Sequence, residues 1–199
     1  MIKKLQALKA KKGFTLVELV VVIAIIGVLA AILVPTMIGV VQDSNITSAN
    51  STASQIKTQA TNFLTNADTH KHSVRGTDSF TTVSATVTSS GWGTVGGSIS
   101  FGDGTKYTLT GGTDKNLDFG LYMADVLRDF KSGYVEIYLK NAAVIGVVVV
   151  PGGQASDVPS ALQADTVWEG TQEITWPGNK AGVGSDSIII GTAPAIAHA

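Results

Sequence analysis

The hydrophobic residues of this chain are concentrated in one long run near its start. No charged residue occurs between Leu19 and Val41, and residues 14–34 are almost entirely apolar. At about 1.5 Å of rise per residue, a helix over residues 14–34 spans roughly 32 Å, close to the hydrocarbon thickness of a bilayer. The pattern therefore predicts a transmembrane helix.

Helical spacing continues after the apolar run ends. Apolar residues recur in steps of three and four and form a narrow stripe: Ala49, Ala53, Ile56, Ala60, Phe63 and Ala67. The residues around this stripe are mostly Ser, Thr and Asn, which are poor helix formers, so the helix must gain stability by packing the stripe on another element. One continuous helix over residues 14–67, about 80 Å long, is expected to end near residues 66–69.

The remainder of the chain predicts a β-rich head. Residues 81–88 alternate polar and apolar positions, as in a half-buried strand, and residues 134–140 place Val135, Ile137 and Leu139 on one face. Asn141 and Ala142 are expected to turn the chain into residues 144–150, an apolar strand buried on both faces. Residues 119–130 predict a short helix with Asp118 as its N-cap. A loop-rich region follows Pro151, with a last strand expected at residues 186–190.

Charge and composition narrow the classes of function. The 199 residues carry a formal net charge of −1. Residues 1–13 contain five lysines and no Asp or Glu, so the chain without that segment carries a net charge of −6. An acidic surface argues against non-specific nucleic-acid binding. The chain has no cysteine, which excludes disulfides, thiolate metal sites and cysteine-based catalysis.

Three interpretations compete for the N-terminal region. The lysines before the apolar run predict a cytoplasmic N-terminus and an outside location for everything after Val41. A secretory signal peptide would have a shorter apolar core, and it leaves Glu18 inside the hydrophobic region. An uncleaved signal anchor fits the length, but it explains neither Glu18 nor the abrupt Lys12–Gly13–Phe14 boundary. The third interpretation depends on that boundary.

The sequence Lys11-Lys12-Gly13-Phe14-Thr15-Leu16-Val17-Glu18 resembles the processing site of type IV prepilins and of the pseudopilins of type II secretion systems. The resemblance covers about 40 residues, in which the basic leader, the Gly-Phe junction, the glutamate and the apolar helix all occur in register. It implies that a prepilin peptidase cuts between Gly13 and Phe14 and methylates the new amine of Phe14. It also implies a long helical spine whose apolar part stays with the mature protein.

Glu18 is the charged group inside the apolar region. An ionisable residue in a membrane segment costs about 2.5–3.5 kcal/mol at the centre, so it usually has a partner. We expect no partner on the same helix face other than the chain's own terminus. The pilin resemblance implies that Glu18 assists assembly by meeting the terminal amine of a neighbouring subunit; the alternative is that Glu18 reaches the cytoplasmic headgroups.

Gly27 and Pro35 mark a weak point in the predicted helix. Proline lacks a backbone donor and clashes with the carbonyl four residues earlier, so the helix should bend or loosen there. The resemblance implies that this stretch melts when a filament forms. A static kink is the alternative, and both can hold at different stages.

Several motifs elsewhere have simpler explanations than catalysis or ligand binding. Residues 91–96 match G-x-G-x-x-G, but a strand at residues 98–101 follows instead of a helix, which predicts a glycine-rich turn. Residues 114–118 lack the glycine and closing glutamate of a calcium loop. His70 and His72 have no evident third ligand, so with Lys71 and Arg75 they predict a solvated loop. His198, the third histidine, lies near the chain end, and no nucleophile motif appears.

These observations predict an α+β fold in which a long N-terminal helix packs on a β-rich, antiparallel-sheet globular head. The expected divisions are a basic leader (1–13), a hydrophobic transmembrane and assembly helix (14–41), an amphipathic helix (42–68) and the head (69–199). We expect a non-enzymatic structural subunit of a type IV pilus, without cofactor or metal. The alternatives are a minor pilin or pseudopilin of a secretion or DNA-uptake filament, and a membrane-anchored surface domain that never polymerises.

The same interpretation predicts the partners and the location. The expected partners are other copies of the chain, the prepilin peptidase, the pilus assembly platform with its ATPase, and membrane lipid before assembly. The protein is expected to cross the cytoplasmic membrane once and then to enter an extracellular filament.

Overall fold

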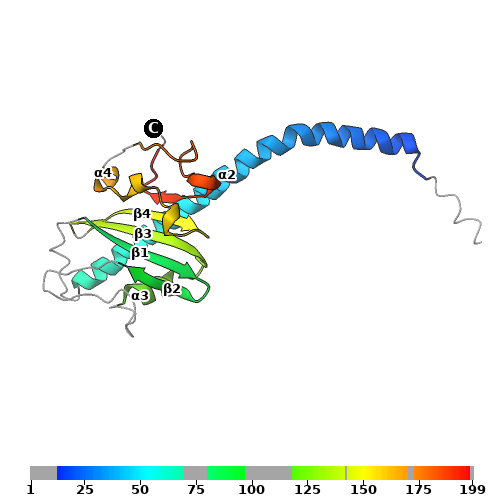
Figure 1. The fold of residues 1–199 in the computed structure, drawn as a ribbon. Helices are drawn as coiled ribbons and strands as arrows, with labels where there is room; N and C mark the ends of the chain where they lie inside the picture. Colours follow the sequence, from blue (N-terminus) through cyan, green and yellow to red (C-terminus); the bar gives the residue numbers. More distant parts are fainter. Residues whose placement is uncertain (1–12, 70–79, 97–117, 142, 170–172, 198–199) are drawn as a thin grey trace, which may run out of the picture. The chain divides into compact units, whose positions relative to one another are not determined.

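Helix α2, Leu16–Thr69, is the longest element of the chain, with 54 residues. The computed structural model describes residues 13–69, 80–96, 118–141, 143–169 and 173–197 (Figure 1). The chain forms two compact units, Met1–Gln42 and Asp43–Ala199. In the first unit the large apolar side chains of α2 from Leu16 to Val41 each expose between 48% and 79% of their surface. A helix that is apolar all round and uncovered fits a lipid environment.

The second unit, here called the head, contains a five-stranded antiparallel sheet (Figure 1). The strands are β1 (Thr81–Thr88), β2 (Gly91–Gly96), β3 (Gly133–Lys140), β4 (Ala143–Pro151) and β5 (Gly191–Ala193), and they lie in the order β2-β1-β3-β4-β5. In the centre of the sheet Val83 pairs with Ile137, and Ile137 pairs with Val147. The predicted α+β class, with a long helix and an antiparallel head, is confirmed.

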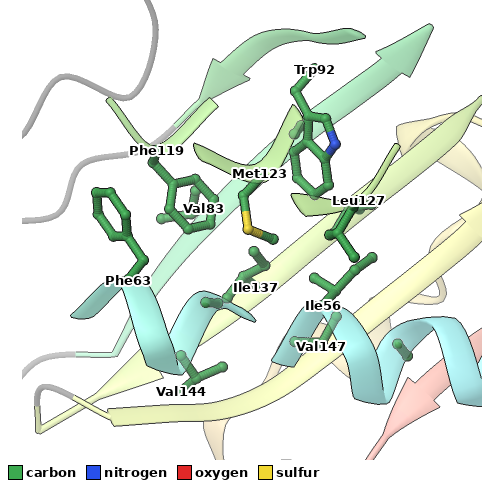
Figure 2. Packing of buried hydrophobic residues seen from close by; sticks show 14 of the residues in the cluster. Ile56, Phe63, Val83, Trp92, Phe119, Met123, Leu127, Ile137, Val144 and Val147 are labelled. Carbon is green, nitrogen blue, oxygen red and sulfur yellow. The ribbon is translucent and has the colours of Figure 1, made fainter. Parts of the chain in front are cut away.

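One face of the sheet is covered by α2 and by α3 (Phe119–Val126). Figure 2 shows Ile56 and Phe63 of α2 beside Phe119 and Met123 of α3, over Ile137 of the sheet. All six residues of the predicted helical stripe are buried. The stripe therefore finds the partner that its poor helix propensity requires.

The other face of the sheet is covered by the C-terminal region. Short turns and helices follow β4: η2 (Ala155–Asp157), η3 (Ser160–Gln163), α4 (Asp165–Trp168) and η4 (Ser185–Ser187). Trp168 and Leu162 from this region pack with Tyr138 and Val148 of the sheet. The indole ring of Trp168 stacks on Tyr138 at a centroid distance of 4.9 Å, and its N–H donates to the Leu162 carbonyl at 2.8 Å.

Most predicted elements of the head are confirmed. The strands at residues 81–88, 134–140 and 144–150 form as expected, and the region after Pro151 is rich in loops. Asp118 caps α3 by accepting the N–H of Leu121 at 2.9 Å. Helix α3 nevertheless ends at Val126 rather than at residue 130. The predicted periodicity reflects packing, because Leu127 and Phe130 contact the same core from outside the helix.

Two predictions for the head are wrong. Residues 91–96 form the edge strand β2, not a turn, and Trp92 joins the core while the chain turns at Ser89 and Ser90. Residues 186–190 contain the turn η4, with Asp186 at a φ of 53°, and the last strand is β5. A strand cannot begin at Asp186 because Asp186 and Ser187 both have positive φ values, which are not extended backbone. At Gly191, where β5 begins, a Cβ would lie 2.3 Å from the Ala49 carbonyl, so glycine lets the chain pass close to α2.

Other predictions lie outside the described residues. They concern the leader, the histidine loop of residues 70–75, most of the calcium-like loop, the strand at residues 98–101, Ala142 of the hairpin turn, and His198.

Candidate functional site

The predicted cleavage point lies just before the first turn of α2. Gly13 and Phe14 are not helical, and Phe14 exposes 87% of its surface. Nothing described lies within 4 Å of the position that a Cβ on Gly13 would occupy. The peptide bond between these two residues is therefore free of the helical hydrogen-bond ladder and open to another protein.

Glu18 is held by Thr15 in a capping box. One carboxylate oxygen of Glu18, Oε2, accepts the backbone N–H and the hydroxyl of Thr15, each at 2.8 Å. The backbone N–H of Glu18 donates to Oγ1 of Thr15 at 3.2 Å. Two polar groups that a helix start leaves unpaired are satisfied in this way.

We expected no partner for Glu18 on its helix face other than the chain's own terminus, and Thr15 is such a partner. Thr15 is a residue of the candidate site that the sequence-based prediction did not include. The pattern Thr-x-x-Glu ahead of an apolar run is the sequence signal of a capping box, and it was present at residues 15–18. The carboxylate therefore enters the apolar region already accepting two hydrogen bonds, which reduces the free-energy cost of placing it there.

Gly27 and Pro35 lie inside α2, which is continuous through both. Pro35 has no N–H to donate to the carbonyl of Ala31. Two residues before Pro35, the carbonyl of Leu33 accepts the hydroxyl of Thr36 at 2.8 Å. The role of this stretch in filament formation stays a prediction.

The apolar part of α2 is long enough to cross a membrane. An 18-residue window of this helix has a mean hydropathy of 3.1, and none of that window is buried within the chain. Glu18 is at one end of the segment and Asp43 at the other, with no charged residue between. The helix thus presents one carboxylate at the start of a lipid-compatible surface.

The head contains a buried carboxylate of its own. Glu136 on β3 is 5% exposed and accepts the hydroxyl of Tyr134 at 3.1 Å and that of Tyr138. Burial, together with the charge of Glu136, raises the pKa of Tyr138. Burial also raises the pKa of Tyr134. These hydrogen bonds all lie along β3. The described residues contain no group of three or more His, Asp or Glu side chains that could bind a metal.

Comparisons with known proteins find similarity in two parts of the chain. Residues 8–34 match the model of the Prokaryotic N-terminal methylation motif. Two proteins of Pseudomonas aeruginosa, each called "Fimbrial protein", are 49% identical to the chain over 53 residues, which is 27% of this chain and 34% of each relative. The chain thus spans about a third of the length of the curated relatives it matches. No solved structure matches.

The methylation motif and the fimbrial relatives support the class of type IV pilins and pseudopilins. The chain belongs to the family described as "Domain of unknown function (DUF5021)", whose model matches residues 46–197.

Proposed function

We propose that this protein is a structural subunit of a type IV pilus. It is cut after Gly13 by a prepilin peptidase, methylated on the amine of Phe14, and polymerised through the N-terminal part of α2. The observation that carries the proposal is the exposed apolar half of α2, which begins with Glu18 four residues after the Gly13–Phe14 bond.

The apolar half of α2 accounts for the stages of this pathway. Its side chains are uncovered within the chain, so they must be surrounded by lipid before assembly and by other copies afterwards. The five lysines of the leader favour a cytoplasmic N-terminus, which places the head outside. The subunit therefore crosses the cytoplasmic membrane once and enters an extracellular filament when the assembly platform and its ATPase extract it.

Glu18 selects the position at which a new subunit docks. Cleavage creates an amine at Phe14, and the carboxylate of a neighbouring Glu18 is the oppositely charged group in the apolar region. In the free subunit the Glu18 carboxylate accepts hydrogen bonds from the backbone N–H and the hydroxyl of Thr15. Docking adds a charged partner to these bonds, and a charge-assisted bond in a medium of low dielectric is stronger than a neutral one.

The test compares two glutamate substitutions of the full chain in its own cells. Glu18→Ala is expected to reduce the protein in sheared surface filaments at least about ten-fold, while cleavage continues and the protein remains in the membrane. Glu173→Ala removes an exposed carboxylate of the head and should leave filaments unchanged. Equal filament yield from wild type and Glu18→Ala would contradict the docking role.

The abundance of the protein in sheared filaments distinguishes a main pilus subunit from a minor pilin or pseudopilin. A pilus subunit dominates the sheared material, whereas the alternative, a minor pilin or pseudopilin of a secretion or DNA-uptake filament, is a small fraction of it. Surface display that does not depend on the prepilin peptidase would contradict both and favour a membrane-anchored domain.

A further inference from the structure

Lys57 is the single charged residue between positions 44 and 66 of α2. Its ammonium group donates to the carbonyl of Ile145 at 2.9 Å. Ile145 lies in a bulge, because the residues on either side of it in β4 pair with the adjacent residues Tyr138 and Leu139 of β3, and β5 ends opposite Val147. Lys57 therefore satisfies a carbonyl that the neighbouring strands do not reach.

The bond to Ile145 accounts for one N–H of Lys57 but not for its charge. In the part of the chain that the structure describes, no carboxylate forms an ion pair with Lys57. A lysine ammonium has three N–H groups, so two remain for another acceptor. The side chain is half-buried, and burial lowers its pKa. A cation partly removed from water is costly without an anion, so an incoming carboxylate would offset that cost.

A groove of about 410 Å³, here called the Lys57 groove, gives access to this cation. One wall is the surface of α2 between positions 54 and 62, and the other is Ala193 with Pro194, where β5 ends. The hydroxyls of Thr58 and Thr61 also line the groove, but both donate to carbonyls of their own helix. The groove therefore has room for a small polar segment and offers Lys57 as the charged group that would hold it.

The region after Pro151 has the opposite charge. It contains five Asp or Glu residues and one Lys, a formal charge of −4. Three of the five acids have a hydrogen-bond or ion-pair partner on their own chain, namely Asp157, Asp165 and Glu169. The other two, Glu173 and Asp186, are exposed, and neither side chain is bonded to another described residue. A second copy of the chain therefore carries carboxylates that can reach a cation on its neighbour.

Asp186 differs from Glu173 because it stands in a closed turn. Ser185, Asp186 and Ser187 form η4 and are all exposed. The N–H of Gly184 donates to the Ile188 carbonyl at 2.8 Å, and the N–H of Ile188 donates to the Ser185 carbonyl at 3.0 Å. Asp186 and Ser187 both have positive φ values, a conformation that costs free energy in residues other than glycine. The turn thus holds one carboxylate at a fixed position on the surface.

We propose that the turn at Asp186 of one copy enters the Lys57 groove of a second copy, where the two side chains form an ion pair. The charges are complementary, and each lacks a partner within its own described chain. A partly buried ion pair between two proteins selects the partner and its register, because any other surface would leave the cation unpaired. The inference rests on the proposed function, since two heads meet in this way only when subunits assemble.

Two matched substitutions of the full chain test the choice of carboxylate. Asp186→Asn removes the charge but keeps a residue that adopts positive φ values, so the turn should still form. We expect about ten-fold or greater loss of this variant from sheared filaments. Glu173→Gln removes the other unbonded carboxylate of the same region and should assemble like wild type. Assembly of Asp186→Asn at the wild-type level would overturn the inference.

Exchange of the two charges tests the pair itself. Asp186→Lys places two cations in contact and should be lost from filaments. Adding Lys57→Glu to the same chain restores an opposite pair, so the double variant should recover most of the lost yield. A double variant that folds, as judged by its tryptophan fluorescence, but stays out of filaments would contradict the pairing. If wild type itself is absent from filaments, the proposed function fails and this inference falls with it.

Cysteine cross-linking tests the contact while both charges stay in place, because the natural chain has no cysteine. Cells would produce a tagged Ser54→Cys copy, altered in the wall of the Lys57 groove, together with an untagged Ser185→Cys copy. We expect a disulfide-linked product of tagged and untagged chains when intact filaments are oxidised. Gln163→Cys, at an exposed position of η3, replaces Ser185→Cys as the control and should give no such product. Absence of the product from filaments that contain both cysteine copies would overturn the assignment of the occupant.

Discussion

Replacing Gly146 by alanine should destabilise the head by forcing Trp168 off the sheet. Gly146 lies in β4 opposite Tyr138 of β3, and the indole ring of Trp168 packs directly on its backbone. A Cβ at position 146 would lie 2.2 Å from two atoms of that ring. Carbon atoms in contact are normally about 3.5–4.0 Å apart, so the ring must move by more than an ångström.

Two contacts resist that movement. The ring is stacked on Tyr138, and its N–H donates to the Leu162 carbonyl at 2.8 Å in a buried position. Overpacking of this kind costs about 1–3 kcal/mol, and loss of the buried hydrogen bond adds about 1 kcal/mol. We therefore expect Gly146→Ala to lower the free energy of unfolding by about 2–4 kcal/mol.

The measurement is guanidinium unfolding of the full chain in detergent, followed by tryptophan fluorescence. All three tryptophans, at positions 92, 168 and 176, lie in the head, so the signal reports the head and not the apolar helix. A double-mutant cycle with Trp168→Phe isolates the clash. In that background Gly146→Ala should cost less than about 1 kcal/mol. The reasoning would be refuted if Gly146→Ala lowered the free energy of unfolding by less than about 0.5 kcal/mol in the natural sequence, or by the same amount with and without Trp168→Phe.

Three further predictions concern other contacts. Gly191→Ala places a Cβ 2.3 Å from the Ala49 carbonyl, and a backbone group cannot rotate away as a side chain can. We expect the free energy of unfolding, measured in the same assay, to fall by about 3 kcal/mol or more, and by less if β5 detaches locally. Because the pKa of Tyr138 is raised in the folded head, its phenolic proton is lost at a lower pH in the unfolded chain than in the folded one. The free energy of unfolding of the head should therefore fall above about pH 10, and Tyr138→Phe should weaken this dependence on pH. Thr15→Val removes the N-cap of α2, which stabilises the helix by about 1 kcal/mol. Backbone amide hydrogens of the first turn should therefore exchange with solvent about five-fold faster in detergent. Thr15→Ser keeps the hydroxyl and should leave these exchange rates unchanged.

The spacing of apolar residues along the chain predicted the helix and the strands that bury a regularly repeated set of side chains. The stripe from Ala49 to Ala67 is buried because a helix needs one apolar side to pack on a sheet. The strand at residues 144–150 was recognisable because a continuous apolar run requires cover on both faces. Both patterns follow from burial alone, so neither needs knowledge of which element lies opposite.

The errors arose where a neighbouring element decides the local structure. Gly93 and Gly96 in β2 suggested a turn, but Trp92 anchors that segment to the core and the sheet edge supplies its hydrogen bonds. Positive φ values at Asp186 and Ser187 interrupt the predicted strand, and β5 begins only at Gly191, where α2 passes too close for any side chain. The alternation in residues 134–140 predicted only that Val135, Ile137 and Leu139 share one face. Glu136 lies on the other face, and it is buried because the aperiodic C-terminal region folds over that face.

The candidate assembly segment was the easiest part to predict from sequence and the part in which one partner was missed. Gly13, Phe14 and Glu18 follow from a motif with a fixed spacing. The hydrogen bonds from Thr15 to Glu18 follow from equally local chemistry. The sequence-based prediction considered only a terminal amine and the cytoplasmic headgroups as partners of that carboxylate. Two local patterns, the processing motif and the capping box, therefore overlap in these residues.

Mass spectrometry of the N-terminal peptide from sheared surface filaments tests the central claim most directly. The account predicts a chain that begins at Phe14, carries a methyl group on its terminal amine and is the main protein of the filament. A filament protein that begins at any other residue, or a chain that retains residues 1–13 at the cell surface, would contradict it.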